Sequence, residues 1–204
     1  KNFVNSSLVK QYVNPIKKLN DSIYSKPNIM ILVMESFGRE YIGAFNKNRK
    51  IKDYISYTPF LDSLSKNSLI FTNAFANGRQ SIEALPSILA SIPSFKVPFT
   101  SSPYSNQKIQ SLVSVFKEKG YSTSFFHGAP NGSMGFLGLS NILGFDNYIG
   151  KNEFNDNSLY DGYWGIWDEP FLQFVNKETT KLKEPFFSTF FSLSSHEPLY
   201  VPKE

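Results

Sequence analysis

The 204-residue sequence contains no cysteine, which excludes disulfide bonds, thiolate metal sites and a cysteine nucleophile. Only 19% of its residues are charged, and it has just two histidines and two tryptophans. No apolar run reaches the roughly 18 residues that a membrane-spanning helix needs. The lysines are scattered and form no basic stripe of the kind that binds nucleic acid, so we expect no nucleic-acid partner.

Hydrophobic residues are plentiful, at 41% of the chain, and they include 20 phenylalanines and 11 tyrosines. This composition is typical of a globular protein with one sizeable core. The net charge of +4 favours an anionic substrate or an anionic membrane surface as partner.

Two regions differ in composition. Residues 1–27 are rich in Asn, Ser and Lys, and we predict a lead-in segment or linker there. Residues 28–204 carry the apolar runs of a folded domain.

The run IMILVM, from Ile29 to Met34, is continuously apolar, which is typical of a strand that is buried on both faces of a parallel sheet. Further strands are predicted at residues 69–76, 121–128 and 185–196, with a brief one near residue 149. Helices are predicted at residues 58–68, 109–120 and 167–178, with a short one in residues 138–149. Strands that alternate with helices predict a doubly wound, mostly parallel α/β sheet with helices on both faces.

Four polar residues follow predicted strands: Glu35, Ser81, His127 and His196. In open parallel sheets, ligands bind outside the carboxyl ends of the strands. Both histidines of the chain therefore fall where a site is expected, together with a carboxylate and a hydroxyl.

Each of these residues also has a structural interpretation. Glu35 could ligate a metal, form a salt bridge with Arg39 or cap the next turn. Ser81 could be a helix N-cap, with Glu83 in the first turn, or a nucleophile that the helix dipole assists. Arg79 could contact an anionic group or lie solvated on the surface.

Four segments, in this order, carry a family resemblance: VMESFGREYIG, FTNAFANGRQSIEALPSILASIPS, FFHG and SLSSHEP. Together they resemble the lipoteichoic acid synthase-like branch of the alkaline phosphatase and sulfatase superfamily, over residues 28–202. The resemblance implies an alkaline phosphatase-like fold and a metal-dependent phosphotransferase or phosphodiesterase.

The resemblance also implies roles for individual residues. Glu35 matches a metal-binding glutamate, and Ser81 matches the nucleophile that also ligates the metal, which would be Mn, Mg or Zn. His127 and His196 match residues that bind the substrate. Ser81 would attack phosphorus and form a covalent intermediate, which a second alcohol or water then releases.

Location and partners follow from the same resemblance. The implied substrate is an anionic lipid or glycan phosphoester of the cell envelope. The catalytic domain would lie outside the cytoplasmic membrane, held there by an N-terminal anchor that precedes this sequence.

Several features depart from the family pattern. The Asp-His pair of a later S-D-H-G block is not within these residues, so we expect the fold to be truncated at its C-terminus, with an incomplete metal site and no activity in this fragment alone. The Trp and Arg that follow the FHG histidine in the glycerol-phosphate polymerases are missing. In their place Asn131 and Ser133 could face the pocket, although Asn-Gly also favours a tight turn.

Two other functions remain open. A non-catalytic binding domain could keep the same fold. A serine esterase could use Ser133, Asp161 and His196, since NGSMG is close to G-x-S-x-G. The formylglycine route of arylsulfatases is disfavoured, because Ser81 is not followed by the Pro and Arg of that motif.

Overall fold

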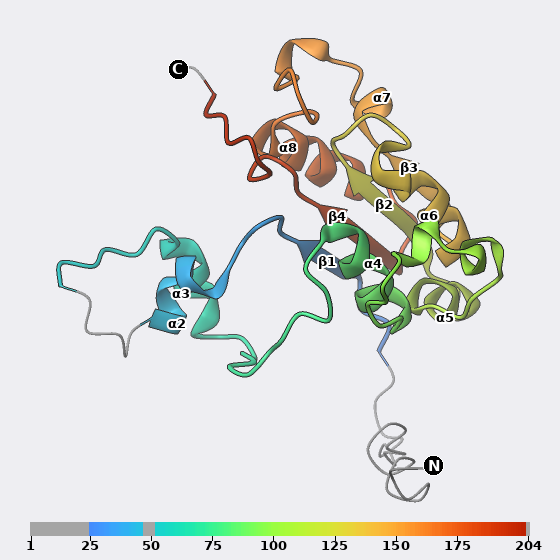
Figure 1. Ribbon diagram of the computed structural model, residues 1–204, viewed down its shortest axis with the longest axis horizontal. Coiled ribbons are helices and arrows are strands. Elements are labelled where there is room, and N and C mark those ends of the chain that lie inside the picture. The colour runs from blue at the N-terminus through green and yellow to red at the C-terminus, as the bar shows by residue number, and fades with distance from the viewer. Residues whose placement is uncertain (1–24, 47–51, 203–204) are drawn as a thin grey trace, which may run out of the picture.

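The computed structural model describes residues 25–46 and 52–202, so most of the predicted lead-in lies outside the described residues. Within the described part of the chain, four parallel strands form one sheet in the order β1-β4-β2-β3 (Figure 1). The strands are β1 (Ile29–Val33), β2 (Ser122–His127), β3 (Asn147–Ile149) and β4 (Phe186–Phe191).

Helices connect these strands. The α-helices are α2 (Gly43–Asn46), α3 (Pro59–Ser65), α4 (Ser81–Ala90), α5 (Leu112–Glu118), α6 (Phe136–Leu143), α7 (Lys151–Phe154) and α8 (Asp168–Thr179). Short 3-10 helices are η1 (Arg39–Tyr41), η2 (Phe99–Ser101), η3 (Pro103–Asn106), η4 (Ser133–Gly135) and η5 (Asn157–Leu159).

The ends of α5 illustrate how local sequence sets these boundaries. The Ser111 hydroxyl accepts a hydrogen bond from the Ser114 N–H at 3.0 Å and so caps the first turn. At the other end Gly120 has φ 87°, a left-handed conformation that a side chain would disfavour. The predicted helix with a closing glycine is therefore confirmed.

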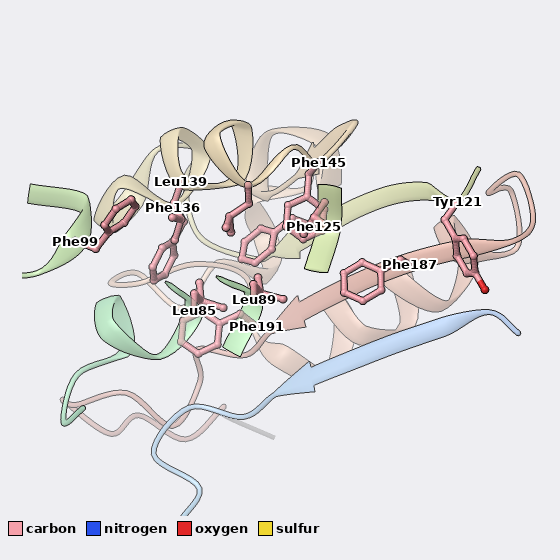
Figure 2. Close-up of a cluster of buried hydrophobic side chains, with 12 residues drawn as sticks. Leu85, Leu89, Phe99, Tyr121, Phe125, Phe136, Leu139, Phe145, Phe187 and Phe191 are labelled. Atoms are coloured by element: carbon pink, nitrogen blue, oxygen red, sulfur yellow. The ribbon is translucent and has the colours of Figure 1, made fainter. Parts of the chain in front are cut away.

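One face of the sheet is covered by α4, α5 and α6. Figure 2 shows side chains of α4 and α6 gathered against phenylalanines of β2 and β4, and Val113 of α5 belongs to the same cluster. The buried members of this cluster are Leu85, Leu89, Phe99, Val113, Tyr121, Phe125, Phe136, Leu139, Leu143, Phe145, Phe187 and Phe191.

The opposite face is covered by α8, whose Phe171 and Val175 pack with Phe126, Ile166 and Phe190. Because successive residues of a strand point to opposite faces, Phe190 and Phe191 enter different clusters. The sheet is thus covered on both sides, and the predicted α/β architecture is confirmed.

Strand β4 lies between β1 and β2, and the three strands end at the same level. Phe191 is aligned with Val33 on one side and with His127 on the other. The segments that follow these three strands therefore emerge at one edge of the sheet.

The strand predicted at residues 69–76 is wrong. This segment contains no strand, and Leu69, Phe71 and Phe75 are exposed. The backbone carbonyl of Thr72 accepts a hydrogen bond from the Arg39 guanidinium at 2.8 Å instead of joining a strand ladder. Strand β1 lies at the edge of the sheet with β4 as its partner, and residues 69–76 do not pair with it.

Strand β4 is also shorter than the prediction of residues 185–196, since it ends at Phe191. The residues from Ser192 to His196 form a loop. Helices α2 and α3 pack on each other and stand apart from the sheet (Figure 1). No helix in the described ranges is long and apolar enough to span a bilayer.

Truncation of Phe190, which is fully buried in the central strand, should destabilise the fold strongly. We expect Phe190→Ala to lower the free energy of unfolding by about 3–5 kcal/mol, through lost burial and the cavity left behind. Phe75→Ala removes the same phenyl group from a side chain that is 90% exposed, and this variant should change the free energy of unfolding by less than about 0.5 kcal/mol. Urea denaturation measures both, and equal losses would contradict the described core.

Candidate active site

Glu35 lies two residues beyond the end of β1, where the chain turns sharply and Ser36 adopts a left-handed φ of 50°. Its carboxylate accepts hydrogen bonds from the hydroxyls of Ser81 at 2.6 Å and Ser36 at 2.9 Å. The alternative salt bridge with Arg39 is not formed, because neither ion pair found among the described residues involves Glu35.

Ser81 is the first residue of α4, and Gln80 occupies the N-cap position. Glu83, the third residue of the helix, accepts hydrogen bonds from the backbone N–H groups of Arg79 at 2.8 Å and Gln80 at 3.2 Å, which is the reciprocal half of a capping box around Gln80. The N-cap interpretation of Ser81 is therefore wrong. Its hydroxyl crosses to Glu35, which is 46 residues away in sequence.

His127 is the last residue of β2 and is only 3% exposed. Its ring stacks on Phe191, with centroids 5.1 Å apart, and its Nδ1 lies 2.9 Å from the Phe191 carbonyl oxygen. Burial lowers the pKa of His127 to about 4, although the bond to Phe191 and the charge of Glu35 act in the opposite direction.

His127 is therefore neutral near pH 7. Since a carbonyl oxygen only accepts hydrogen bonds, Nδ1 carries the proton and donates a hydrogen bond to the Phe191 carbonyl oxygen. The Nε2 lone pair is left as an acceptor.

His196 follows β4 by five residues, in the loop that starts at Ser192. Its ring contacts Trp164 with centroids 4.2 Å apart, and its Nδ1 lies 2.8 Å from the Glu197 carbonyl oxygen. The loop thus returns His196 to the edge of the sheet where Glu35 lies.

Two cavities meet at Glu35, Met134 and His196. One, of about 230 Å³, has a mostly apolar wall and is lined by Glu35, His127, Ala129, Pro130, Ser133, Met134, Tyr163, Trp164, Phe191, Ser192, Leu193 and His196. The other, of about 410 Å³, is lined by Glu35, Arg79, Gln80, Ser81, Ile82, Met134 and His196. Five of the six predicted site residues therefore lie around one pair of adjoining cavities.

Asn131 is the exception. Its amide nitrogen lies 3.1 Å from each carboxylate oxygen of Glu153, and it lines neither of these cavities. The neighbouring Gly132 has φ 93°, in keeping with the tight turn that Asn-Gly favours.

The alternative esterase triad is not assembled in the described structure. The Asp161 carboxylate accepts hydrogen bonds from the N–H groups of Tyr163, Trp164 and Gly165 at 2.8–3.0 Å, and none is found between Asp161 and His196 in the described structure. Ser133 lies in η4 rather than on a turn directly after a strand. This arrangement does not support a Ser-His-Asp esterase.

Sequence reasoning missed the aromatic wall that Tyr163 and Trp164 add to the smaller cavity. The two aromatics lie between glycines in a short turn that the bridge of Tyr160 with Ile166 closes. Large aromatic residues in such a turn are a sequence signal that could have identified this wall.

Glu35 and Ser81 are the residues here that could hold a metal. Glu35 and Ser81 offer oxygen ligands within hydrogen-bonding distance of each other, as hard divalent cations require. No group of three or more His, Cys, Asp or Glu side chains that could hold a metal is found in residues 25–46 and 52–202. Glu35 and Ser81 therefore fit a divalent cation only as two of its ligands, and the cation would need further ligands.

Comparison with known proteins identifies the family and the fold of the chain. A family model described as Sulfatase matches residues 27–204. The lipoteichoic acid synthase-like protein YvgJ of Bacillus subtilis (strain 168) is 23% identical over 208 residues, which cover 94% of this chain and 32% of YvgJ.

Solved structures share the fold. A protein of the alkaline phosphatase superfamily from Vibrio parahaemolyticus has a TM-score of 0.73 at 24% identity, covering 87% of this chain and 43% of its own. Lipoteichoic acid synthase LtaP from Listeria monocytogenes has a TM-score of 0.68 at 26% identity, covering 85% and 42%. The C-terminal periplasmic domain of EcEptC from Escherichia coli, in complex with Zn, has a TM-score of 0.59 at 19% identity, covering 90% and 48%.

The chain thus spans about a third of YvgJ and less than half of each solved neighbour. The resemblance to the lipoteichoic acid synthase-like branch is confirmed. Because the family model matches residues 27–204, the chain belongs to the Sulfatase family and has the parallel-sheet fold of the alkaline phosphatase superfamily.

Proposed function

We propose that this chain forms part of a metal-dependent phosphotransferase or phosphodiesterase that acts on phospholipid or glycan phosphoesters of the cell envelope, with Ser81 as nucleophile. One observation carries the proposal: the Ser81 hydroxyl, at the first turn of α4, donates to the Glu35 carboxylate instead of capping the helix. An otherwise uncommitted hydroxyl beside a carboxylate in a cavity is the arrangement that nucleophilic catalysis requires.

Ser81 Oγ passes its proton to Glu35 and attacks the phosphorus atom, forming a new O–P bond while the bond to the first alcohol breaks and the departing oxygen takes a proton from water. Water or a second alcohol then attacks the same phosphorus atom, releases its proton to solvent and breaks the bond to Ser81 Oγ, which takes its proton back from Glu35. A divalent cation held by Glu35, Ser81 and further ligands would favour the Ser81 alkoxide. The hydrogen bond already directs the proton of Ser81 to Glu35.

The surroundings of Ser81 suit a phosphoryl group. The amino end of a ten-residue helix attracts anions, because its first N–H groups and its dipole point at them. Arg79 and His196 line the same cavity, and we assign them to contacts with the phosphoryl oxygens. Neutral His127 faces the smaller cavity, where its Nε2 can accept a hydrogen bond from a hydroxyl of the substrate.

The envelope location is part of the same proposal. Among the relatives, one is named a lipoteichoic acid synthase and another a periplasmic domain. We infer that this chain likewise works outside the cytoplasmic membrane, held there by an anchor that precedes residue 1. The net charge of +4 favours an anionic substrate at such a surface.

Replacement of Ser81 tests the proposal directly. In the native-length polypeptide that contains this sequence, we expect Ser81→Ala to lower Mn²⁺-dependent cleavage of bis(p-nitrophenyl) phosphate by about 1,000-fold or more, because the attacking oxygen is lost. Ser87→Ala removes a hydroxyl near the far end of the same helix, where it donates to the Ile92 carbonyl, and should leave the rate unchanged.

Other outcomes identify the alternatives. Activity that persists in Ser81→Ala but disappears in Ser133→Ala would support an esterase-like site instead. Substrate binding without any metal-dependent turnover in the native-length protein would support a binding domain. Either result would overturn the proposed function.

The lowered pKa of His127 makes stability depend on pH. Between its ordinary value of 6.5 and its folded value of about 4, the unfolded chain binds more protons, so the free energy of unfolding falls as the solution becomes more acidic. Lowering the pH from 6.5 to 4.5 should cost about 2 kcal/mol through this residue.

Urea denaturation of the wild type and His127→Gln at both pH values isolates the effect. The carboxylates titrate in both proteins, so the difference between their two losses belongs to His127. Equal losses would show that His127 titrates normally and that its pKa is not lowered by burial.

A further inference from the structure

The backbone of Glu35 is held on both sides by serine hydroxyls from the loop after β4. Its N–H donates to Ser192 Oγ at 2.7 Å, and its carbonyl oxygen accepts from Ser195 Oγ at 2.5 Å. These bonds join residues that are 157 and 160 positions apart in the sequence.

The position of Glu35 explains why such bonds are needed. The parallel ladder between β1 and β4 ends with the bond from the Ser192 N–H to the Val33 carbonyl, at 3.0 Å. Beyond it, the polar backbone groups of Glu35 have no strand partner, and Ser36 turns away at φ 50°. The two hydroxyls replace the missing ladder bonds, as buried or half-buried backbone groups require.

The loop that supplies the hydroxyls is itself fixed to α8. Asp168, the first residue of this helix, accepts hydrogen bonds from the N–H groups of Leu193 at 2.8 Å and Ser194 at 2.9 Å. In return, Ser194 Oγ accepts from the Asp168 N–H at 2.7 Å. The loop that carries Ser192 and Ser195 is therefore bonded to α8 through Leu193 and Ser194, while Ser192 and Ser195 contact Glu35.

We propose that Ser192 and Ser195 are positioning residues, which fix the backbone of Glu35 so that its carboxylate meets Ser81. With the backbone fixed, the carboxylate moves only through its side-chain torsions, and the Ser81 contact at 2.6 Å restricts these further. Partners that orient a ligand in this way typically change metal affinity or activity by 10- to 100-fold when removed. The inferred effect on metal binding rests on the proposed function of Glu35.

The test uses Ser192→Ala, Ser195→Ala and Ser195→Thr in the native-length protein. Titration calorimetry with Mn²⁺ alone should give a dissociation constant about 10-fold higher for Ser195→Ala, and Ser195→Thr should restore it because the hydroxyl is kept. Ser188→Ala is the matched control: this serine is buried in β4 with no partner for its hydroxyl, and the variant should bind Mn²⁺ as the wild type does.

Hydrogen exchange of the Glu35 amide provides a readout that does not depend on function. Ser192→Ala removes the acceptor of this amide, so its exchange should become at least 10-fold faster, with exchange in α5 unchanged. A merely structural role of the serines would lower the melting temperature and leave Mn²⁺ affinity as in the wild type, which would overturn the proposal.

The two proposals fail in different ways. A wild-type protein that binds no Mn²⁺ would overturn the metal role of Glu35, and exchange at the Glu35 amide would still decide whether the serines hold its backbone. Unchanged exchange in Ser192→Ala would overturn the positioning role even if the wild type binds Mn²⁺.

Discussion

The parallel pairing of β4 with both β1 and β2 is the constraint on which the rest of this structure depends. Three strands from distant parts of the chain end at one level, with Val33, Phe191 and His127 in register. Whatever follows each strand must then emerge at the same edge. Glu35, His127 and the loop that carries His196 come together for this reason. Contacts between the side chains of the site are not needed to explain it.

The core explains why this pairing is stable. Phenylalanines alternate along β4 between the cluster under α4, α5 and α6 and the cluster under α8, so the central strand is buried on both faces. Helix α4 has two roles in consequence. Its Leu85 and Leu89 pack in the core, and the same packing holds Ser81, at the start of the helix, against Glu35.

Sequence patterns predicted the strand β1 from its continuous apolar run, and they predicted the helix that Gly120 closes. The prediction that β1 is buried on both faces is wrong, because β1 is an edge strand and Leu32 is 57% exposed. The patterns failed for residues 69–76, because an apolar run indicates hydrophobicity and not the presence of a neighbouring strand. They also predicted that β4 continues to His196, whereas it ends at Phe191. The end of β4 is set by the ends of its neighbours β1 and β2, and the sequence of β4 alone does not contain that information. Glu35 follows β1 and His127 ends β2 as predicted, whereas Ser81 follows no strand and reaches the cavity at the start of α4. The sequence left open whether Ser81 caps this helix, and the structure has Gln80 at the N-cap position. The contacts of Ser192 and Ser195 with Glu35 join residues more than 150 positions apart, and no local pattern indicates them.

Mass spectrometry of the covalent intermediate tests the central claim most directly. The native-length protein would be incubated with bis(p-nitrophenyl) phosphate, quenched in acid and digested, and the modified residue located by fragmentation. The account predicts a phosphoryl-containing adduct on Ser81 and none on Ser87. An adduct on Ser133, or turnover without any adduct on Ser81, would contradict it.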